Sequence, residues 1–212
     1  MMVGVQVRAG TGGGRVAGLV LAPGAGSGRD QPGLVAISRT LEASGVHVER
    51  IDFPYRLAGR RAPDRPPVLI AAIVDAAERL GAELGVPPDA IALGGRSMGG
   101  RIASMVAASG RPCAALVLVS YPLHPPGRPE RLRVEHFPGI TVPALFVSGS
   151  RDAFGTPAEL AAATAAIPGP VERVVLDGGD HGLGRHDEAV ASAVAGFLDR
   201  VSPPGLDGAR TP

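Results

Sequence analysis

Short, almost entirely apolar runs alternate along this chain with segments of helical periodicity. Residues 17–22 form a continuous apolar run, and residues 114–120 form another that is apolar up to Ser120. Such runs are expected of parallel strands that are covered on both faces. Between such runs, apolar residues recur at the spacing of an amphipathic helix, for example Leu34, Ile37 and Leu41. This alternation predicts an α/β fold with a mainly parallel central sheet and helices on both of its faces.

Glycines and prolines between these runs set the expected element boundaries. A chain of 212 residues suits one core and no linker divides it, so we expect a single domain over residues 1–202 and a disordered tail over residues 203–212. Residues 57–67 and 121–142 are expected to be irregular because they are rich in proline. The expected strands are residues 3–7, 17–22, 46–53, the apolar run from residue 91, 114–120, 143–148 and 171–176. The expected helices are a periodic segment that ends at Gly45, residues 68–84, a segment that follows the glycine-rich turn at residues 95–99 and ends near residue 109, residues 157–167 and residues 188–201.

Charge excludes several classes of function. The chain has 21 basic and 20 acidic residues, and a net charge of +1 gives no reason to expect a nucleic acid or an acidic partner. All of the basic residues are arginine. Without lysine the chain can form neither a lysine Schiff base nor a P-loop.

The apolar composition bears on cofactors and location. Cys113 is the single cysteine, which excludes an internal disulfide and disfavours a cysteine-based zinc site, and it is expected to be a buried small hydrophobe. We expect neither cofactor nor metal. No apolar stretch approaches the roughly 18 residues of a membrane span, and the N-terminus lacks the apolar core of a signal peptide. These features predict a cytoplasmic protein that does not bind membranes, while a homo-oligomer is left open.

One tight turn, Gly95-Arg96-Ser97-Met98-Gly99, carries the strongest chemical signal. An apolar run leads into it and a helix-forming segment follows, which is the context in which G-x-S-x-G presents a nucleophilic serine. Such a turn crowds the residues two before and two after the serine, so both must be small. The alternative is a glycine-rich turn whose serine only caps the helix. We take Ser97 as the candidate nucleophile.

Two further polar residues follow predicted strands at the edge where Ser97 is expected. Reactive groups in parallel sheets collect beyond the carboxyl ends of the strands. Asp152 follows the strand at residues 143–148, and His181 follows the strand at residues 171–176. A neutral imidazole would take the serine proton, and a buried carboxylate would hold that imidazole in the required tautomer. The order Ser97, Asp152, His181 therefore predicts a catalytic triad.

Other residues compete for these roles. Asp152 could instead cap the helix expected from residue 157, with Asp180 as the acid. Because Asp180 is adjacent to His181 and would point elsewhere, Asp152 is the better candidate. Three other histidines compete with His181 as the base but fit its place less well, and they are His124, His136 and His186.

A serine nucleophile also requires backbone N–H donors for the oxyanion. The first candidate is the N–H of Met98, the residue after the nucleophile. The second should come from the glycine loop at residues 23–26, where we assign Ala25, with Gly26 as the alternative. A dinucleotide-binding fingerprint in this loop would require glycine at the position of Arg29, and a P-loop would require lysine, so both are excluded.

Candidate substrate-binding residues lie near the expected irregular segments. No insertion is large enough for a separate cap domain, so only residues 54–67 and 121–142 could cover the site. Arg56 or Arg96 could hold a substrate carboxylate, although either could equally be solvated or paired within the protein. The full set of candidates is Tyr55, Arg56, Tyr121, His124 and Phe154.

Six segments together carry a family resemblance: residues 21–26, 52–56, 94–101, 120–127, 149–155 and 179–181. The chain resembles the α/β-hydrolase superfamily from about residue 19 to 200. Within it, the chain is most similar to the small dienelactone-hydrolase-like type, in the group of the testis-expressed hydrolase-like protein and a subunit of the nonspecific-lethal complex. The resemblance implies the α/β-hydrolase fold with little or no cap domain. It also implies Ser97, Asp152 and His181 as nucleophile, acid and base.

Two departures from the wider family limit the resemblance. Pro23-Gly24 stands where many hydrolases of this fold have His-Gly, and serine replaces the cysteine nucleophile of dienelactone hydrolases, so dienelactone specificity is not implied. We expect a cofactor-independent serine hydrolase of the carboxylic ester hydrolase class. It would cleave a small-molecule ester or related acyl bond through an acyl-enzyme. The alternatives are a non-catalytic binding or scaffold protein, and a peptidase or acyltransferase that uses the same triad.

Overall fold

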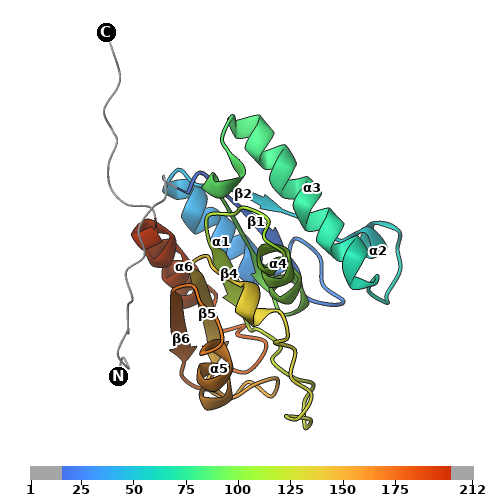
Figure 1. Cartoon of the computed structure of the whole chain (residues 1–212), viewed down its shortest axis with the longest axis vertical. Helices are drawn as coiled ribbons and strands as arrows, with labels where there is room; N and C mark the ends of the chain where they lie inside the picture. Colours follow the sequence, from blue (N-terminus) through green and yellow to red (C-terminus); the bar gives the residue numbers. More distant parts are fainter. Residues whose placement is uncertain (1–15, 202–212) are drawn as a thin grey trace.

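The computed structural model describes residues 16–201 and is built on a six-stranded parallel sheet (Figure 1). The strand order is β2-β1-β3-β4-β5-β6, and every pair of neighbours is parallel. Within the described residues the chain therefore enters the sheet at β1, an interior strand, passes outward to β2, then crosses back over β1 and continues to β6. The strands are β1 (Gly18–Ala22), β2 (His47–Arg50), β3 (Ile91–Arg96), β4 (Leu116–Val119), β5 (Ala144–Gly149) and β6 (Val171–Leu176).

Helices cover both faces because the direction of strand addition reverses after β2. Right-handed crossovers that run in opposite directions leave their helices on opposite faces of a sheet. Accordingly α1 and α6 pack together on one face, and α3 and α4 pack on the other (Figure 1). The helices are α1 (Pro32–Ala43), α2 (Pro54–Leu57), α3 (Pro66–Leu84), α4 (Met98–Ala108), α5 (Pro157–Thr164) and α6 (Asp187–Val201), with 3-10 turns η1 (Pro88–Ala90) and η2 (Phe137–Gly139).

Burial on both faces explains the continuous apolar runs. In β5, Ala144 and Phe146 join the core under α3 and α4, while Leu145 and Val147 join the core under α1 and α6. All four residues are fully buried. The α/β fold class with a parallel sheet and helices on both faces is thereby confirmed.

Several boundaries differ from expectation, and proline accounts for two of them. The irregular segment expected from residue 57 is shortened at both ends, because Pro54 begins α2 and Pro66 begins α3. Proline is tolerated in a first helical turn, where its missing N–H would have no intrahelical acceptor. β4 ends at Val119 because Ser120 has a φ of 48°. The strand expected at residues 3–7 and the tail at residues 203–212 lie outside the described residues.

None of the helices between residues 16 and 201 combines the length and hydropathy of a bilayer-spanning segment.

Helix α4 approaches the end of β1 so closely that only glycine fits at the contact. A Cβ at Gly99 would collide with the backbone carbonyl of Ala22 and lie 2.7 Å from the carbonyl oxygen of Pro23. Both obstacles are backbone atoms, which cannot swing aside as a flexible side chain can. Gly196 in α6 differs, because a Cβ there would meet only the terminal Nη1 of Arg200, at 3.3 Å.

We expect Gly99→Ala to lower the free energy of unfolding by about 1–3 kcal/mol or more, the usual cost of overpacking a close contact. Gly196→Ala is the matched control and should be neutral or stabilising by up to about 1 kcal/mol, since alanine is the better helix former. Denaturant unfolding of both variants measures the difference. Equal stability of the two variants would show that the α4–β1 contact is not tight.

A hydrogen bond between the buried Ser104 and the half-buried His136 attaches the irregular segment at residues 121–142 to α4. The Ser104 hydroxyl donates to the carbonyl of Arg101 at 2.7 Å and lies 2.7 Å from His136 Nε2. Because that hydroxyl proton is used on Arg101, the imidazole must donate to the serine oxygen, which places its proton on Nε2. Burial, assisted by the charge of Arg101, lowers the pKa of His136 to about 4.

This lowered pKa predicts a loss of stability in acid. Between pH 6.5 and about 4 the unfolded chain binds a proton on His136 that the folded protein does not, so the free energy of unfolding should fall as the pH is lowered through this window. Denaturant titrations across the window measure the slope. His136→Gln, which keeps a neutral donor, should flatten it, and equal slopes in variant and wild type would contradict the assignment.

Candidate active site

Three polar residues converge beyond the carboxyl ends of β3, β5 and β6. Ser97 directly follows β3, Asp152 follows β5, and His181 follows β6. Since all strands of the sheet are parallel, these ends lie along the same edge. The Ser97 N–H donates to the carbonyl of Val119 at 2.8 Å, which holds the serine turn to the neighbouring strand β4.

Ser97 occupies a strained backbone conformation. Its φ of 51° and ψ of −117° lie outside the regions that side-chain-bearing residues commonly adopt. Strain of this kind costs about 1–3 kcal/mol and persists only where the surroundings determine it. Here Gly95 and Gly99 allow the turn to press against the Ala22 carbonyl, because a Cβ at either position would collide with that oxygen. The turn therefore has the steric form that the sequence predicted for it.

Hydrogen bonds join the three residues in one relay. Ser97 Oγ lies 2.9 Å from His181 Nε2. His181 Nδ1 lies 2.9 Å and 2.8 Å from the two carboxylate oxygens of Asp152. An acceptor-only carboxylate requires the proton to sit on Nδ1, which leaves the Nε2 lone pair for the serine hydroxyl. This is the tautomer that a general base needs.

The acid and the base are held by their own neighbours. The Asp152 carboxylate is buried, and its Oδ1 also accepts the backbone N–H of Phe154 at 2.8 Å. The ring of Phe154 stacks on the imidazole of His181, with centroids 4.0 Å apart and planes inclined by 28°. Of the substrate-binding candidates, Phe154 is thus the one placed directly against the triad.

The competing acid and bases lie elsewhere. Asp180 Oδ1 accepts the backbone N–H groups of Gly182 (2.8 Å) and Leu183 (3.1 Å), which shapes the turn after His181. Among the described residues, none of the other histidine candidates forms a hydrogen bond with Ser97 or Asp152. His136 bonds Ser104, and His124 bonds Pro125 and Glu159. His186 directly precedes α6.

The glycine loop after β1 lies against the nucleophile. A Cβ at Gly24 would be 3.5 Å from Cβ of Ser97. The Gly26 N–H donates to the hydroxyl of Tyr55 at 3.2 Å, so it is not free for a substrate. No acceptor within the described chain bonds the N–H of Ala25 or of Met98. This arrangement favours Ala25 over Gly26 as the second oxyanion donor, beside Met98 at the start of α4.

Three substrate-binding candidates are core residues in the structure. Tyr55 is fully buried, and its side chain supports the glycine loop. Tyr121 is buried and donates its hydroxyl to the carbonyl of Arg133 at 2.7 Å. His124 is buried with Nε2 3.5 Å from Glu159. The sequence could not distinguish a buried tyrosine from one that lines a pocket, because either kind can stand next to a proline, as Tyr55 and Tyr121 do.

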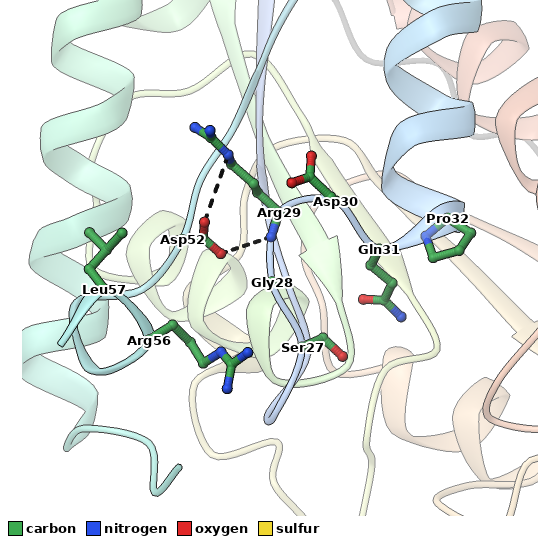
Figure 2. A pocket seen from close by; sticks show the side chains of 9 residues that line it. All are labelled: Ser27, Gly28, Arg29, Asp30, Gln31, Pro32, Asp52, Arg56 and Leu57. Atoms are coloured by element: carbon green, nitrogen blue, oxygen red, sulfur yellow. Dashed lines mark hydrogen bonds and ion pairs between the residues drawn. The ribbon is translucent and has the colours of Figure 1, made fainter. Parts of the chain in front are cut away.

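The fifth candidate, Arg56, lines an open hollow of about 490 Å³ beside the glycine loop (Figure 2). Arg29 lies against Asp52, which accepts its backbone N–H at 2.8 Å, and Asp30 pairs with Arg50 at 3.0 Å. Arg56 is exposed and has no acidic partner among the described residues, and its side chain extends toward Ser27. The lining residues are Ser27, Gly28, Arg29, Asp30, Gln31, Pro32, Asp52, Arg56 and Leu57.

The hollow begins close to the nucleophile. The Ser27 N–H donates to the carbonyl of Gly24 at 3.1 Å, which closes a tight turn. The ends of such a turn lie within about 7 Å of each other. Ser27, on the wall of the hollow, is therefore one turn away from the glycine that contacts Ser97.

The described part of the chain holds no group of three or more His, Cys, Asp or Glu side chains arranged to bind a metal ion. Cys113 is buried, and burial raises the pKa of its thiol to about 12. A thiol held protonated is a poor nucleophile.

Solved structures with the same fold include proteins from several bacteria. An alpha-beta serine hydrolase homologue from Coxiella burnetii superposes with a TM-score of 0.73 at 19% identity, over 92% of this chain and 90% of that one. Est1E from Butyrivibrio proteoclasticus, with ferulic acid bound, gives a TM-score of 0.72 at 19% identity, over 88% and 89% of the two chains. A hydrolase of the α/β superfamily from Xanthomonas campestris gives 0.64 at 26% identity, over 87% and 99%.

A family model described as an alpha/beta hydrolase domain matches residues 15–196, which is most of the sequence. The matched region contains the whole sheet, the serine turn and both residues that hydrogen bonds connect to Ser97. The chain therefore belongs to the α/β hydrolase domain family.

Proposed function

We propose that this protein is a cofactor-independent serine hydrolase that cleaves a small ester or a related acyl bond through an acyl-enzyme. The observation that carries the proposal is the relay from Ser97 Oγ through His181 to the buried carboxylate of Asp152. The serine hydrolase homologue from Coxiella burnetii and the α/β-superfamily hydrolase from Xanthomonas campestris support a hydrolytic role.

The proposed first step is acylation. Ser97 Oγ attacks the carbonyl carbon while its proton passes to Nε2 of His181, and Asp152 stabilises the imidazolium. The N–H groups of Met98 and Ala25 stabilise the negative charge on the carbonyl oxygen. The tetrahedral intermediate then collapses, and the leaving alcohol takes the proton from Nε2.

The second step repeats the first with water as the nucleophile. His181 removes a proton from water, the hydroxide attacks the acyl carbon, and Ser97 leaves and recovers its proton. Each step returns the triad to its starting protonation state. A peptidase or an acyltransferase would use the same residues. The shape of the pocket decides which acyl compound binds and whether water or another molecule accepts the acyl group.

We expect Ser97→Ala to abolish both esterase activity and covalent labelling by a fluorophosphonate, with the wild-type adduct located on Ser97 by mass spectrometry. Asp152→Asn should lower kcat by about 10⁴-fold because the imidazole loses the partner that fixes its tautomer.

The chain provides a matched control. Like Ser97, Ser104 lies within hydrogen-bond distance of a histidine nitrogen, 2.7 Å from His136 Nε2, but it is fully buried. Ser104→Ala should keep labelling and activity. A wild-type protein that is folded, inert toward a broad ester panel and unlabelled would overturn the proposal. If that inert protein also co-purified with a stable partner, the result would favour a scaffold role.

For the substrate, we propose that Arg56 favours acyl groups that carry a negative charge. Two arginines line the hollow, and among the described residues Arg29 has an acidic partner, Asp52, whereas Arg56 has none. Arg56→Ala should raise KM about two- to fivefold for an ester with a carboxylate on its acyl chain, as expected for an exposed ion pair. Neutral esters should be unaffected.

Arg61→Ala, which removes an exposed arginine outside the hollow, controls for the general loss of charge. Parallel kinetics with a neutral and an anionic ester of equal length measure the effect. If KM for both esters changes equally in Arg56→Ala, the arginine does not select the substrate.

The finer family placement stays a proposal. The segments that resemble the testis-expressed and nonspecific-lethal-complex group run through the serine turn and two loops. These are the acid loop, which carries Asp152 after β5, and the histidine loop, which carries His181 between β6 and α6. A subunit role in a complex is the corresponding alternative, and the labelling experiment above separates it from catalysis.

A further inference from the structure

Arg96, the residue before the nucleophile, directs its side chain inward. The residue is half-buried at the end of β3. Its Nη2 donates to the backbone carbonyl oxygen of His181 at 2.5 Å, a contact between residues 85 positions apart in the sequence. The guanidinium therefore reaches from the serine turn to the backbone that carries the candidate base.

The same guanidinium also contacts the segment that follows the glycine loop. With its amide oxygen turned toward the arginine, Gln31 accepts from Arg96 Nε at 3.2 Å and from Nη1. Gln31 is the N-cap residue of α1, and its own N–H donates to the carbonyl of Gly28 at 3.1 Å. Arg96 thus connects three segments: the serine turn, the loop of His181, and the loop between β1 and α1.

The backbone of His181 depends on this contact. On one side of it, Arg151 holds Gly179, whose carbonyl accepts the Arg151 N–H at 2.8 Å. On the other side, Asp180 bonds the N–H of Gly182 at 2.8 Å. Within residues 16–201, Arg96 is the one hydrogen-bond partner of the His181 backbone itself.

A pocket of about 130 Å³ lies beside Arg96 and the residues that follow His181. Residues of the histidine loop, including Gly182 and Leu183, line it together with Arg96 and the start of α1. The hydrogen bond from Arg96 therefore holds the backbone of His181 on a side where a pocket interrupts the packing, while Asp152 and Phe154 hold its imidazole.

Arginine suits this place for two reasons. Its planar group presents several donors in a fixed arrangement, so it can bond two separate loops at once, whereas the ammonium of lysine is a compact point charge. Burial lowers the pKa of Arg96, while the nearby charges of Asp152, Asp180 and Asp187 act in the opposite direction. An arginine remains protonated in such surroundings.

We propose that Arg96 is a positioning residue that holds the His181 backbone, and with it the imidazole, at hydrogen-bond distance from Ser97. It acts by tying the histidine loop to the β1–α1 loop. The inference rests on the proposed hydrolase function, and it assigns Arg96 to the protein's own loops instead of to a substrate carboxylate, because each of its three nitrogens already donates a hydrogen bond within the protein.

The test compares Arg96→Met, Arg96→Lys and the wild type for kcat and KM on a neutral ester. We expect Arg96→Met to lower kcat about 10- to 100-fold with KM nearly unchanged, since a small displacement of a catalytic group has effects of this size. Arg96→Lys should be intermediate because one ammonium can reach the carbonyl but not both loops.

Arg133→Met is the matched control. Burial also lowers the pKa of Arg133, which donates to the carbonyl of Pro122 at 3.4 Å, away from the triad. Its kcat should stay at the wild-type value. An unchanged kcat in Arg96→Met would overturn the proposal, and so would a loss confined to KM, which would mean direct contact with substrate. If Arg96→Met does not fold, wild-type kcat in Arg96→Lys would overturn it.

Proton NMR of the His181 Nδ1–H, bonded to Asp152, provides a readout that does not need turnover. We expect a low-field resonance in the wild type that broadens or disappears in Arg96→Met and persists in Arg133→Met. An inert wild type that shows this pattern would overturn the hydrolase proposal but support the positioning role. An active wild type whose resonance and kcat survive Arg96→Met would do the reverse.

Discussion

The close contact between the start of α4 and the end of β1 is the constraint on which the site depends. Glycine at positions 95 and 99 lets these backbones meet at the Ala22 carbonyl, with no room for a Cβ. That contact holds Ser97 in a conformation that the isolated chain would avoid. It also brings the loop after β1 against the nucleophile, so one steric condition sets both the serine and the candidate oxyanion donor.

Around this rigid centre, hydrogen bonds between loops complete the arrangement. The loops that follow β1, β5 and β6 have little regular structure, and each is held by a side chain from another segment. Tyr55 in α2 bonds the glycine loop, and Arg96 at the end of β3 bonds the histidine loop. The core supplies stability, while these few polar contacts decide whether the reactive atoms lie at bonding distance.

Much of the fold and of the candidate site could be predicted from local sequence patterns. The serine turn was recognisable because its requirements, an apolar run, small neighbours and a helix, all lie within a short stretch. The strand at residues 171–176 coincides with β6 because Gly169-Pro170 precedes its pattern and Asp177-Gly178 follows it. The roles of Tyr55 and Tyr121 were not predictable, since the direction of a tyrosine in a proline-rich segment depends on which distant backbone group it meets.

Local sequence patterns were enough to predict the six strands of the sheet and the five longer helices in their order along the chain, although not α2, and to place a serine, an aspartate and a histidine each after its own strand. This was possible because strand and helix periodicity are local properties. The sequence favoured Asp152 over Asp180 and Ala25 over Gly26, but the contacts that separate these alternatives appear only in the folded protein. There Asp152 meets His181, the Gly26 N–H bonds Tyr55 while no described residue bonds that of Ala25, and Arg96 turns into the protein. Those choices depend on contacts between loops far apart in the chain, which no local pattern encodes.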